Sequence, residues 1–354
     1  MDYDIKNARN AKETYQLMKK RLSGVVPEFE LEYKAELAYK INSLKKEKNA
    51  VILAHNYMEP ALYHSVSDFT GDSLELARIS VETDADIIIF CGVRFMAETA
   101  KILNPSKTVL LPAQKAGCSL AASITADDVR ELKKRFPGVP VVSYVNTYAS
   151  VKAETDICCT SSNASRVIEY LAEQGHDRVI FIPDEYLAKN VAAETGHPII
   201  FPSLPGKSDE DDPENMKRVL YGWRGRCEVH EQFTVEDIEN VREQFPDTLI
   251  LAHPECSPEV VRSADYSGST KKMIDYVKNS NAPRYLLLTE CAMGDNIAAE
   301  NPEKDMLRLC SVRCPHMNTI TLEDTLSALK KTRYEITLPE HIISKARKSL
   351  DRML

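Results

Sequence analysis

The chain has 354 residues, of which 43% are hydrophobic and 28% are charged, a composition typical of globular proteins. The formal net charge of −8 argues against a nucleic-acid-binding surface, and no apolar run reaches the roughly 20 residues needed to span a membrane. The polar N-terminal segment 1–16 lacks the apolar core of a secretory signal, so we expect a cytoplasmic protein.

The first predicted strand ends in polar residues. A helical segment, 30–48, leads into the apolar run VILAH at 51–55, which ends at His55 and is followed by Asn56 and Tyr57. Short apolar runs that stop at a polar loop are typical of buried strands in α/β proteins. Side chains just beyond the C-terminal end of such a strand lie where α/β folds bind ligands.

The same pattern returns along the chain. Segments 123–146 and 232–255 each have as third residue a Thr that can cap a helix, continue as an amphipathic helix with a Phe-Pro stop, and end in an apolar strand. The second repeats the Ala-His strand end as LILAHPE at 249–255. A further segment, 319–340, starts the pattern once more and ends in a closing helix. The two later strand ends supply the polar or loop residues Tyr144, Val145, Asn146, His253, Pro254 and Glu255.

Each strand end is followed by further elements in the same order. Hydroxyl-rich turns that open a helix occur at 69–78, 159–168 and 266–274. A strand and a helix that ends in MAET, AAET or AAEN follow at 86–100, 178–196 and 284–301. A third strand then leads to a cysteine, which is Cys118, Cys227 or Cys314. The middle unit is longer because of segment 206–222, which we interpret as an inserted exposed loop or short helix.

This order predicts an α/β protein of three homologous three-layer αβα units around a pseudo-threefold axis. The alternative is the ordinary alternation of strands and helices in any α/β chain, which does not explain the matched turns and cysteines. We place the units at 1–118, with the N-terminal helices, at 119–227 and at 228–318. Segment 319–354 is expected to be helical and to pack back on the first unit.

Nine cysteines are many for a cytoplasmic protein, in which they are more often buried, catalytic or metal-bound than disulfide-bonded. Cys118, Cys227 and Cys314, one from each unit, would meet at the axis. Three thiolates can hold zinc with an open coordination position, or a [4Fe–4S] cluster in which one iron has no protein ligand. Cys256 competes with Cys227 for this role and Cys310 competes with Cys314, while the other cysteines are expected in the core.

Hydroxyl and acid–base groups would share this centre. Ser73, Ser161 and Thr270 occupy matching positions near helix starts, where free N–H groups favour anions. For any one of them a helix cap is the simpler interpretation, but three around one centre favour a substrate with several carboxylates or a phosphate. Arg94 and Lys115 could add positive charge. The candidates for proton transfer are His55, Tyr57, Tyr144, His230, His253 and Glu255.

Ten short segments match, in order, the motifs of one family. They are AHNY (54–57), GDS (71–73), FMAETAKIL (95–103), GC (117–118), YVN (144–146), TSSNA (160–164), CEVH (227–230), HPE (253–255), GST (268–270) and CPHM (314–317). From about residue 50 to residue 330 the chain therefore resembles the quinolinate synthase family. The resemblance implies three homologous αβα domains and an oxygen-sensitive [4Fe–4S] cluster held by three cysteines. It also implies condensation of iminosuccinate with dihydroxyacetone phosphate to quinolinate, with loss of phosphate and water, in NAD synthesis.

Carried over motif by motif, the resemblance implies that Cys118, Cys227 and Cys314 hold the cluster, which favours Cys227 over Cys256. It implies iminosuccinate contacts at His55, Ser73, Tyr144, Val145, Asn146, Ser161, His253, Pro254, Glu255 and Thr270. We expect the open iron to act as a Lewis acid. The expected catalytic residues are Glu255, Tyr144, His253 and His55. A separate enzyme that oxidises aspartate would supply the unstable imine.

Other interpretations of the same residues stay open. The three thiolates would also suit a zinc hydrolase, and a cluster alone would suit an iron–sulfur redox or oxygen sensor. A radical enzyme that uses S-adenosylmethionine is disfavoured, because CSVRCPHM at 310–317 lacks the CxxxCxxC run. The same segment offers a Cys310–Cys314 disulfide under oxidation.

Overall fold

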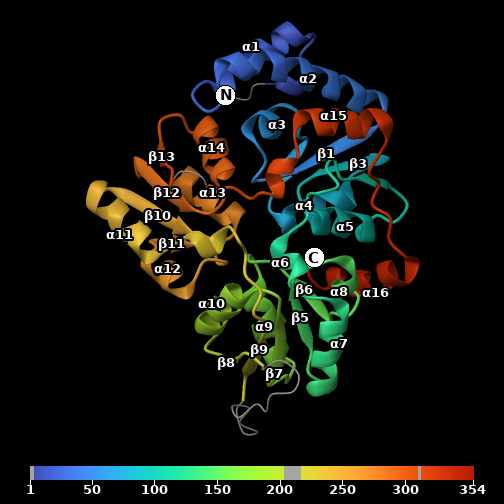
Figure 1. The fold of residues 1–354 in the computed structure, drawn as a ribbon, viewed down its shortest axis with the longest axis vertical. Coiled ribbons are helices and arrows are strands. Elements are labelled where there is room, and N and C mark those ends of the chain that lie inside the picture. The colour runs from blue at the N-terminus through green and yellow to red at the C-terminus, as the bar shows by residue number, and fades with distance from the viewer. Residues whose placement is uncertain (1–3, 203–216, 310–311) are drawn as a thin grey trace.

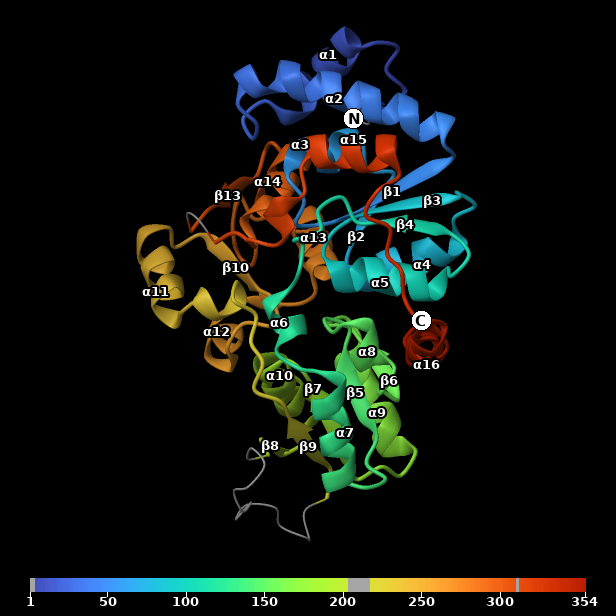
Figure 2. The same cartoon turned by 45° about the vertical axis from the view of Figure 1, so that its right-hand side comes forward.

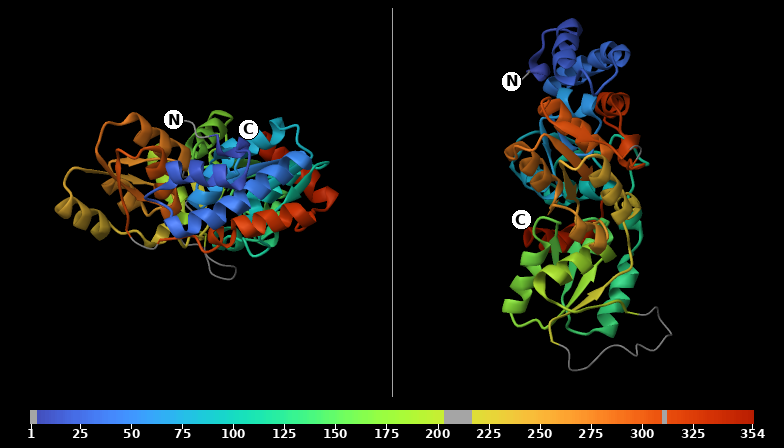
Figure 3. Two further views of the ribbon diagram at one scale, coloured as in Figure 1. Left: turned by 90° about the horizontal axis from the view of Figure 1, so that it is seen from above. Right: turned by 90° about the vertical axis from the view of Figure 1, so that its left-hand side faces the viewer.

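Three parallel β-sheets, each flanked by helices, form the protein (Figure 1). This computed structural model describes residues 4–202, 217–309 and 312–354. Figures 2 and 3 show an elongated molecule with the N-terminal helices at one end and the second sheet at the other. The N-terminal elements are η1 (Ile5–Asn7), α1 (Ala11–Leu22) and α2 (Glu28–Glu47).

The first sheet is built around the strand that ends at His55. Its strand order is β2-β1-β3-β4, and all neighbours are parallel. Residues 51–55 are buried, as expected for a strand covered on both faces. The strands are β1 (Ala50–His55), β2 (Phe69–Gly71), β3 (Ile87–Cys91) and β4 (Thr108–Leu110). The helices are α3 (Pro60–Ser65), α4 (Ser73–Glu82) and α5 (Arg94–Leu103).

The third sheet repeats this arrangement with the order β11-β10-β12-β13, again with parallel neighbours. Its strands are β10 (Thr248–Ala252), β11 (Tyr266–Ser267), β12 (Arg284–Leu288) and β13 (Asp305–Leu307). The accompanying helices are η2 (His230–Gln232), α11 (Val235–Gln244), α12 (Pro258–Ser263), α13 (Thr270–Asn279) and α14 (Cys291–Glu300). Because corresponding strands occupy corresponding places, the C-terminal ends of β1 and β10 present their histidines in the same way.

The second sheet has five parallel strands in the order β6-β5-β7-β9-β8. The strands are β5 (Val141–Tyr144), β6 (Ile157–Cys159), β7 (Arg178–Ile182), β8 (Ile199–Ile200) and β9 (Val219–Gly222). The helices are α6 (Ser119–Ala122), α7 (Ala126–Arg135), α8 (Ala149–Lys152), α9 (Ala164–Glu173) and α10 (Glu185–Thr195). Strand β9 pairs with β7 in this sheet as β4 pairs with β3 in the first sheet, so the two strands occupy equivalent positions.

Strand β9 corrects one expectation from the sequence. Residues 219–222 fall in the segment that we interpreted as an exposed insertion, yet all four are buried. The short apolar run Val-Leu-Tyr-Gly pairs with strands on both sides, and the ring of Tyr221 stacks on Phe136 at 4.0 Å. The cause of the error is the acidic stretch that precedes this run, of which residues 203–216 lie outside the described residues.

The matched lead segments share their helix starts. Thr125 before α7 and Thr234 before α11 each form a capping box, in which the Thr side chain accepts the N–H of an Asp three residues on. That carboxylate, from Asp128 or Asp237, accepts the N–H of the capping Thr in return. The two segments therefore start their helices by the same local interactions, as the sequence predicts.

The C-terminal segment contacts two units. Helix α15 (Leu322–Lys331), after the turn η3 (Met317–Thr319), packs on α2, and helix α16 (Glu340–Asp351) packs between α5 and α8 (Figures 1 and 2). The hydroxyl of Ser349 in α16 donates to the backbone oxygen of Lys152 in α8 at 3.0 Å. The C-terminal helix thus joins the first unit to the second.

The predicted fold class is confirmed, since the structure is α/β with three parallel sheets of matching strand order, each covered by helices. The largest hydrophobic cluster runs from the first unit into the second and includes residues of α15 and α16. Within the described ranges, every helix is too short or too polar to cross a membrane.

Candidate active site

One carboxylate joins all three units where their strand-end loops meet. Asp72 caps α4 of the first unit, and its Oδ1 accepts the N–H groups of Leu74 and Glu75 at 3.0 Å each. Its Oδ2 accepts the hydroxyl of Ser162 from the second unit at 3.0 Å and that of Ser269 from the third unit at 3.2 Å. The loops of all three units therefore converge on one region, as the sequence repeat suggests.

The two Ala-His strand ends share one local geometry. The Nδ1 atoms of His55 and His253 each accept the backbone N–H two residues on, from Tyr57 and Glu255, at 3.3 Å. Each ring therefore carries its proton on Nε2. Burial lowers the pKa of His55 to about 4 and that of His253 to about 3, so both rings are neutral at pH 7. In this form they are suited to donate a hydrogen bond.

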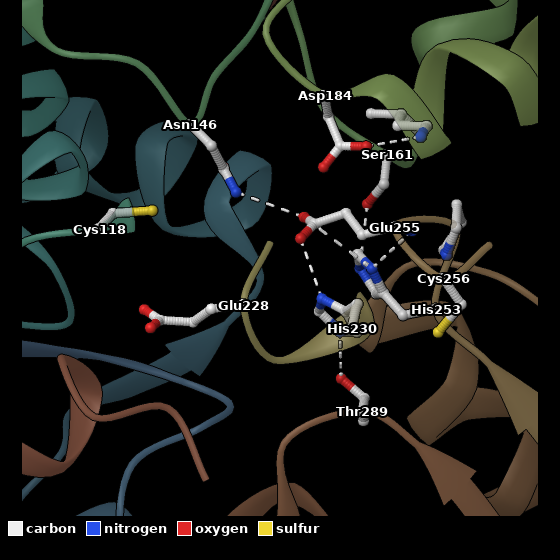
Figure 4. Close-up of polar contacts among 12 residues, drawn as sticks. Cys118, Asn146, Ser161, Asp184, Glu228, His230, His253, Glu255, Cys256 and Thr289 are labelled. Atoms are coloured by element: carbon white, nitrogen blue, oxygen red, sulfur yellow. Dashed lines mark hydrogen bonds and ion pairs between the residues drawn. The ribbon is translucent and has the colours of Figure 1, made fainter. Parts of the chain in front are cut away.

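Glu255 is the centre of a buried hydrogen-bond network (Figure 4). Its Oε1 accepts a short hydrogen bond from the hydroxyl of Tyr144 and a second one from Asn146 Nδ2 at 3.3 Å. Its Oε2 lies 3.0 Å from Nδ1 of His230. The other ring nitrogen of His230 lies 2.9 Å from the hydroxyl of Thr289. Side chains from the second and third units thus fix one carboxylate.

These neighbours determine which groups carry charge. Burial alone would raise the pKa of Glu255, but the electrostatic interaction and hydrogen bond with His230, together with His253 and the hydrogen bond from Tyr144, hold it below the ordinary range. Burial and the Glu255 charge raise the pKa of Tyr144 well above its usual value. The same two causes raise the pKa of the fully buried Asp184. An ionised Glu255 is thus hydrogen-bonded to the neutral phenol of Tyr144.

Cys118, Cys227 and Cys314 each open a short helical turn. Cys118 caps α6, and its sulfur accepts the N–H three residues on at 3.4 Å. The N–H groups two and three residues after Cys227 and after Cys314 lie near those sulfurs and favour their ionised form. Burial nevertheless raises the pKa of Cys118 to about 12 and that of Cys314 to about 11. The sulfurs therefore need a bound cation to become thiolates.

The positions of these sulfurs can be compared with what two kinds of metal centre need. All three line one cavity together with Glu255. In the described parts of the chain, one group of three possible metal ligands has all its ligand atoms within 4.8 Å of one another, and it consists of Cys227, His230 and Glu255. The sulfurs of Cys118, Cys227 and Cys314 do not form such a group, so at least one pair of them is farther apart than 4.8 Å. A single tetrahedral zinc, with Zn–S bonds of about 2.3 Å, would hold three sulfurs about 3.8 Å apart. The wider spacing of three soft ligands fits an iron–sulfur cluster better.

Cys256 packs in the core of the third unit. Its Sγ donates to the backbone oxygen of Leu288 at 3.4 Å, and the side chain is fully buried. Figure 4 shows it on the far side of His253 from Cys118. The other competing cysteine, Cys310, and with it the expected Cys310–Cys314 disulfide, lies outside the described residues.

The hydroxyls of Ser73, Ser161 and Thr270 line the same cavity. The simpler interpretation that they cap their helices is wrong, because another residue is the N-cap in each case, namely Asp72 for α4, Asn163 for α9 and Ser269 for α13. Ser73 and Thr270 are the first residues of α4 and α13. Their hydroxyls can therefore donate to an anion in the cavity, whereas the N–H groups of Leu74, Glu75 and Lys272 are already bonded to the capping side chains.

A larger groove lies elsewhere, between α4, α9 and the C-terminal residues, with a volume of about 1390 Å³. Charged side chains such as Arg78, Arg166 and Arg352 line it, but none of its lining residues is a cysteine. We place the active site in the smaller cavity, because there the cysteines, the ionised carboxylate and the strand-end histidines come together.

Comparison with known proteins shows the family of the chain. The family described as Quinolinate synthetase A protein matches residues 39–354. The chain belongs to the quinolinate synthetase A family of enzymes. It is 52% identical over 314 residues to quinolinate synthase 2 of Mesorhizobium japonicum, a match that covers 89% of each chain. It is 50% identical over 334 residues to the quinolinate synthase of Agrobacterium fabrum, covering 94% of this chain and 90% of the relative. It is 49% identical over 344 residues to the quinolinate synthase of Sinorhizobium fredii, covering 97% of this chain and 89% of the relative.

The resemblance seen in the sequence is thus confirmed at the level of the quinolinate synthetase A family. Most residues that it implied line the cavity, namely Cys118, Cys227, Cys314, His55, Ser73, Tyr144, Asn146, Ser161, His253, Glu255 and Thr270. Val145 and Pro254 do not line it. The N–H of Val145 donates to the oxygen of Cys159, and the oxygen of Pro254 accepts Asn190 Nδ2, both at 2.8 Å. Arg94 pairs with Glu98 at 2.9 Å, and Lys115 is exposed.

Three residues near the centre were not singled out from the sequence. Asp72 lies inside the quoted GDS motif, but nothing local shows that it contacts two other units. Thr289 follows β12 directly, so the strand-end argument that selected His253 could have found it as well. Asp184 caps α10, and the sequence signal of such a residue does not differ from that of an exposed helix cap.

Proposed function

We propose that the protein is a cytoplasmic quinolinate synthase that condenses iminosuccinate with dihydroxyacetone phosphate, with release of phosphate and water, in NAD synthesis. The observation that carries the proposal is the meeting of three cysteines, one from each unit, with the Glu255 network in one cavity. The names of the relatives support the activity, and the resemblance noted above supplies the two substrates.

Cys118, Cys227 and Cys314 would hold the [4Fe–4S] cluster. The backbone N–H groups near each sulfur would stabilise the thiolates. With three protein ligands, the cluster would leave one iron open to the substrate, where it supplies Lewis-acid polarisation. The donor set and its spacing support this assignment over a zinc hydrolase built on the same three cysteines.

Neutral donors in the cavity would bind the carboxylates of iminosuccinate. His55 and His253 would donate from Nε2, and Ser73, Ser161 and Thr270 would donate from their hydroxyls. Hydrogen bonds to a charged acceptor are worth about 1.5–3 kcal/mol each, so a few of them can hold a dicarboxylate in a single orientation. Orientation of two reactants in one cavity accounts for a large part of the catalysis of a condensation.

Glu255 would act as the general base. It is ionised and buried, and two donors hold its Oε1 while Oε2 faces His230. The Tyr144 hydroxyl stays protonated and would return a proton to a leaving oxygen. A neutral His253 beside them would donate a hydrogen bond during the steps that lose phosphate and water.

The test is an anaerobic assay of the reconstituted protein with oxaloacetate, ammonia and dihydroxyacetone phosphate, with quinolinate measured by mass spectrometry. The proposal predicts quinolinate only when all three are present, and faster formation when an aspartate-oxidising enzyme supplies the imine. Cys256→Ala should remain active as a matched control, because Cys256 is a core residue. Reconstituted, folded protein that makes no quinolinate from these reactants would contradict the proposal.

A further inference from the structure

A compact set of metal ligands lies beside the three cysteines. Cys227, His230 and Glu255 offer a sulfur, a nitrogen and a carboxylate oxygen that all lie within 4.8 Å of one another, and no other such group occurs in the described ranges. We propose that these side chains bind one zinc ion in protein that lacks its cluster. We also propose that the bound ion prevents cluster assembly, a consequence that rests on the proposed function because Cys227 is shared.

Each ligand has an outer partner that orients it. Thr289 Oγ1 lies 2.9 Å from Nε2 of His230, which leaves Nδ1 facing Glu255 at 3.0 Å. Oε1 of Glu255 accepts the hydroxyl of Tyr144, so Oε2 is the oxygen directed to the histidine. Backbone N–H groups two and three residues on lie near the sulfur of Cys227 and favour its thiolate. Outer partners of this kind are typical of metal sites built by proteins.

Charge and size both favour zinc. A thiolate and a carboxylate together balance one divalent cation, and the side chains of His230 and Glu255 are only 2% and 4% exposed, where unbalanced charge is costly. Zinc bonds of about 2.0–2.3 Å need ligand atoms about 3.3–3.8 Å apart. The three ligand atoms lie within 4.8 Å of one another, so each pair must move closer together by at most roughly 1–1.5 Å. Mixed sulfur, nitrogen and oxygen donors suit zinc, whereas magnesium and calcium prefer oxygen alone.

The two metal centres differ in the cysteines that they need. The cluster requires Cys118, Cys227 and Cys314, whereas the zinc site requires only Cys227. A zinc ion on Cys227 leaves the cluster with two protein thiolates and occupies the carboxylate that we propose as the general base. Zinc-loaded protein should therefore take up iron and sulfide poorly until a chelator removes the zinc.

The test uses the full chain, prepared anaerobically without iron and titrated with Zn²⁺ against a chromophoric chelator. We expect one ion per chain and, with Co²⁺ in its place, near-ultraviolet absorption from a thiolate ligand. Cys227→Ser and His230→Ala should weaken binding by about 100-fold or more, and Thr289→Val should weaken it about 10–100-fold, as loss of an outer partner does. Cys118→Ser, Cys314→Ser and Cys256→Ala should bind zinc as the wild type does.

Several outcomes would overturn the inference. Zinc binding that is lost equally in Cys118→Ser and Cys314→Ser would place the ion on the three thiolates instead. Tight binding in His230→Ala, or Co²⁺ absorption without a thiolate band, would exclude the proposed ligands. Thermal unfolding with a chelator present shows whether each variant folds, and His230→Gln replaces His230→Ala if the latter does not. Failure of the cluster assay alone leaves the zinc result intact, so the two proposals fail separately.

Discussion

Lys152 makes a prediction that depends on both the fold and the site. It is fully buried in α8, and its ammonium donates to the backbone oxygens of Val145 at 2.8 Å and of Thr147 through a shorter contact. These two carbonyls flank Asn146, whose side chain donates to Glu255. Lys152 therefore holds the loop that brings Asn146 to the carboxylate.

The cost of removing this ammonium follows from the same contacts. In Lys152→Met the oxygen of Val145 keeps the N–H of Thr147, but the oxygen of Thr147 loses its one donor among the described residues. One unsatisfied buried carbonyl costs about 1–3 kcal/mol of unfolding free energy. A loop shift that breaks the Asn146–Glu255 hydrogen bond, worth about 1.5–3 kcal/mol, should slow quinolinate formation about 10–100-fold.

The pH dependence gives a sharper test. Burial lowers the pKa of Lys152 from 10.5 to about 8, so the unfolded chain binds the proton more tightly than the folded one. The stability of the wild type relative to Lys152→Met should therefore rise with pH above about 8. At 1.36 kcal/mol per pKa unit the full effect is about 3 kcal/mol, of which about 2 kcal/mol falls between pH 7 and pH 9.5.

The assay is urea unfolding of both proteins at a series of pH values, together with kcat and KM at pH 7.5. Lys101→Met is a matched control, because Lys101 is also buried but donates to the oxygen of Lys107 away from the cavity. It should lose stability and keep its KM. A stability difference that stays constant from pH 7 to pH 9.5, or an unchanged rate in Lys152→Met, would refute the reasoning.

Three further predictions concern the carboxylates. Asp72→Ala should cost roughly 4 kcal/mol in urea unfolding, because it loses a helix cap and two hydrogen bonds from other units. Asp128→Ala, which removes the exposed carboxylate of the α7 capping box, should cost about 1 kcal/mol; equal costs would show that the contacts of Asp72 with the other units contribute nothing. Asp184→Asn should cost less in urea unfolding than Asp184→Ala, because Asn keeps an oxygen that can accept the N–H of Leu187 at the start of α10; equal costs would show that this hydrogen bond contributes nothing. Glu255→Gln should slow turnover by about 100-fold or more in a folded protein, and wild-type turnover would exclude it as the base.

The repeated elements of the fold were predictable because their signals are local. Apolar runs ending in Ala-His, Thr-initiated helices and matched turns recur in the sequence, and each depends on residues within one turn or one strand. Strand β9 was missed for a related reason. Its four residues follow a long acidic stretch, and whether such a short run forms a strand depends on an open sheet edge far away in sequence.

The interactions between units were not predictable from local signals. Asp72 contacts Ser162 and Ser269, which lie 90 and 197 positions away, and no pattern in the sequence sets such pairs apart from exposed polar residues. Lys152 and Asp184 illustrate the same limit, because the sequence does not show whether an ionisable residue is buried or exposed. The strand ends could be found because β topology alone brings them together.

Iron and sulfide analysis of anaerobically purified protein tests the central claim most directly, since the claim is that one cysteine from each unit holds a single cluster. The account predicts equal amounts of iron and inorganic sulfide in the wild type and in Cys256→Ala, and loss of both in Cys118→Ala, Cys227→Ala and Cys314→Ala. A folded Cys118→Ala protein that keeps its iron, its brown colour and its activity would contradict the account.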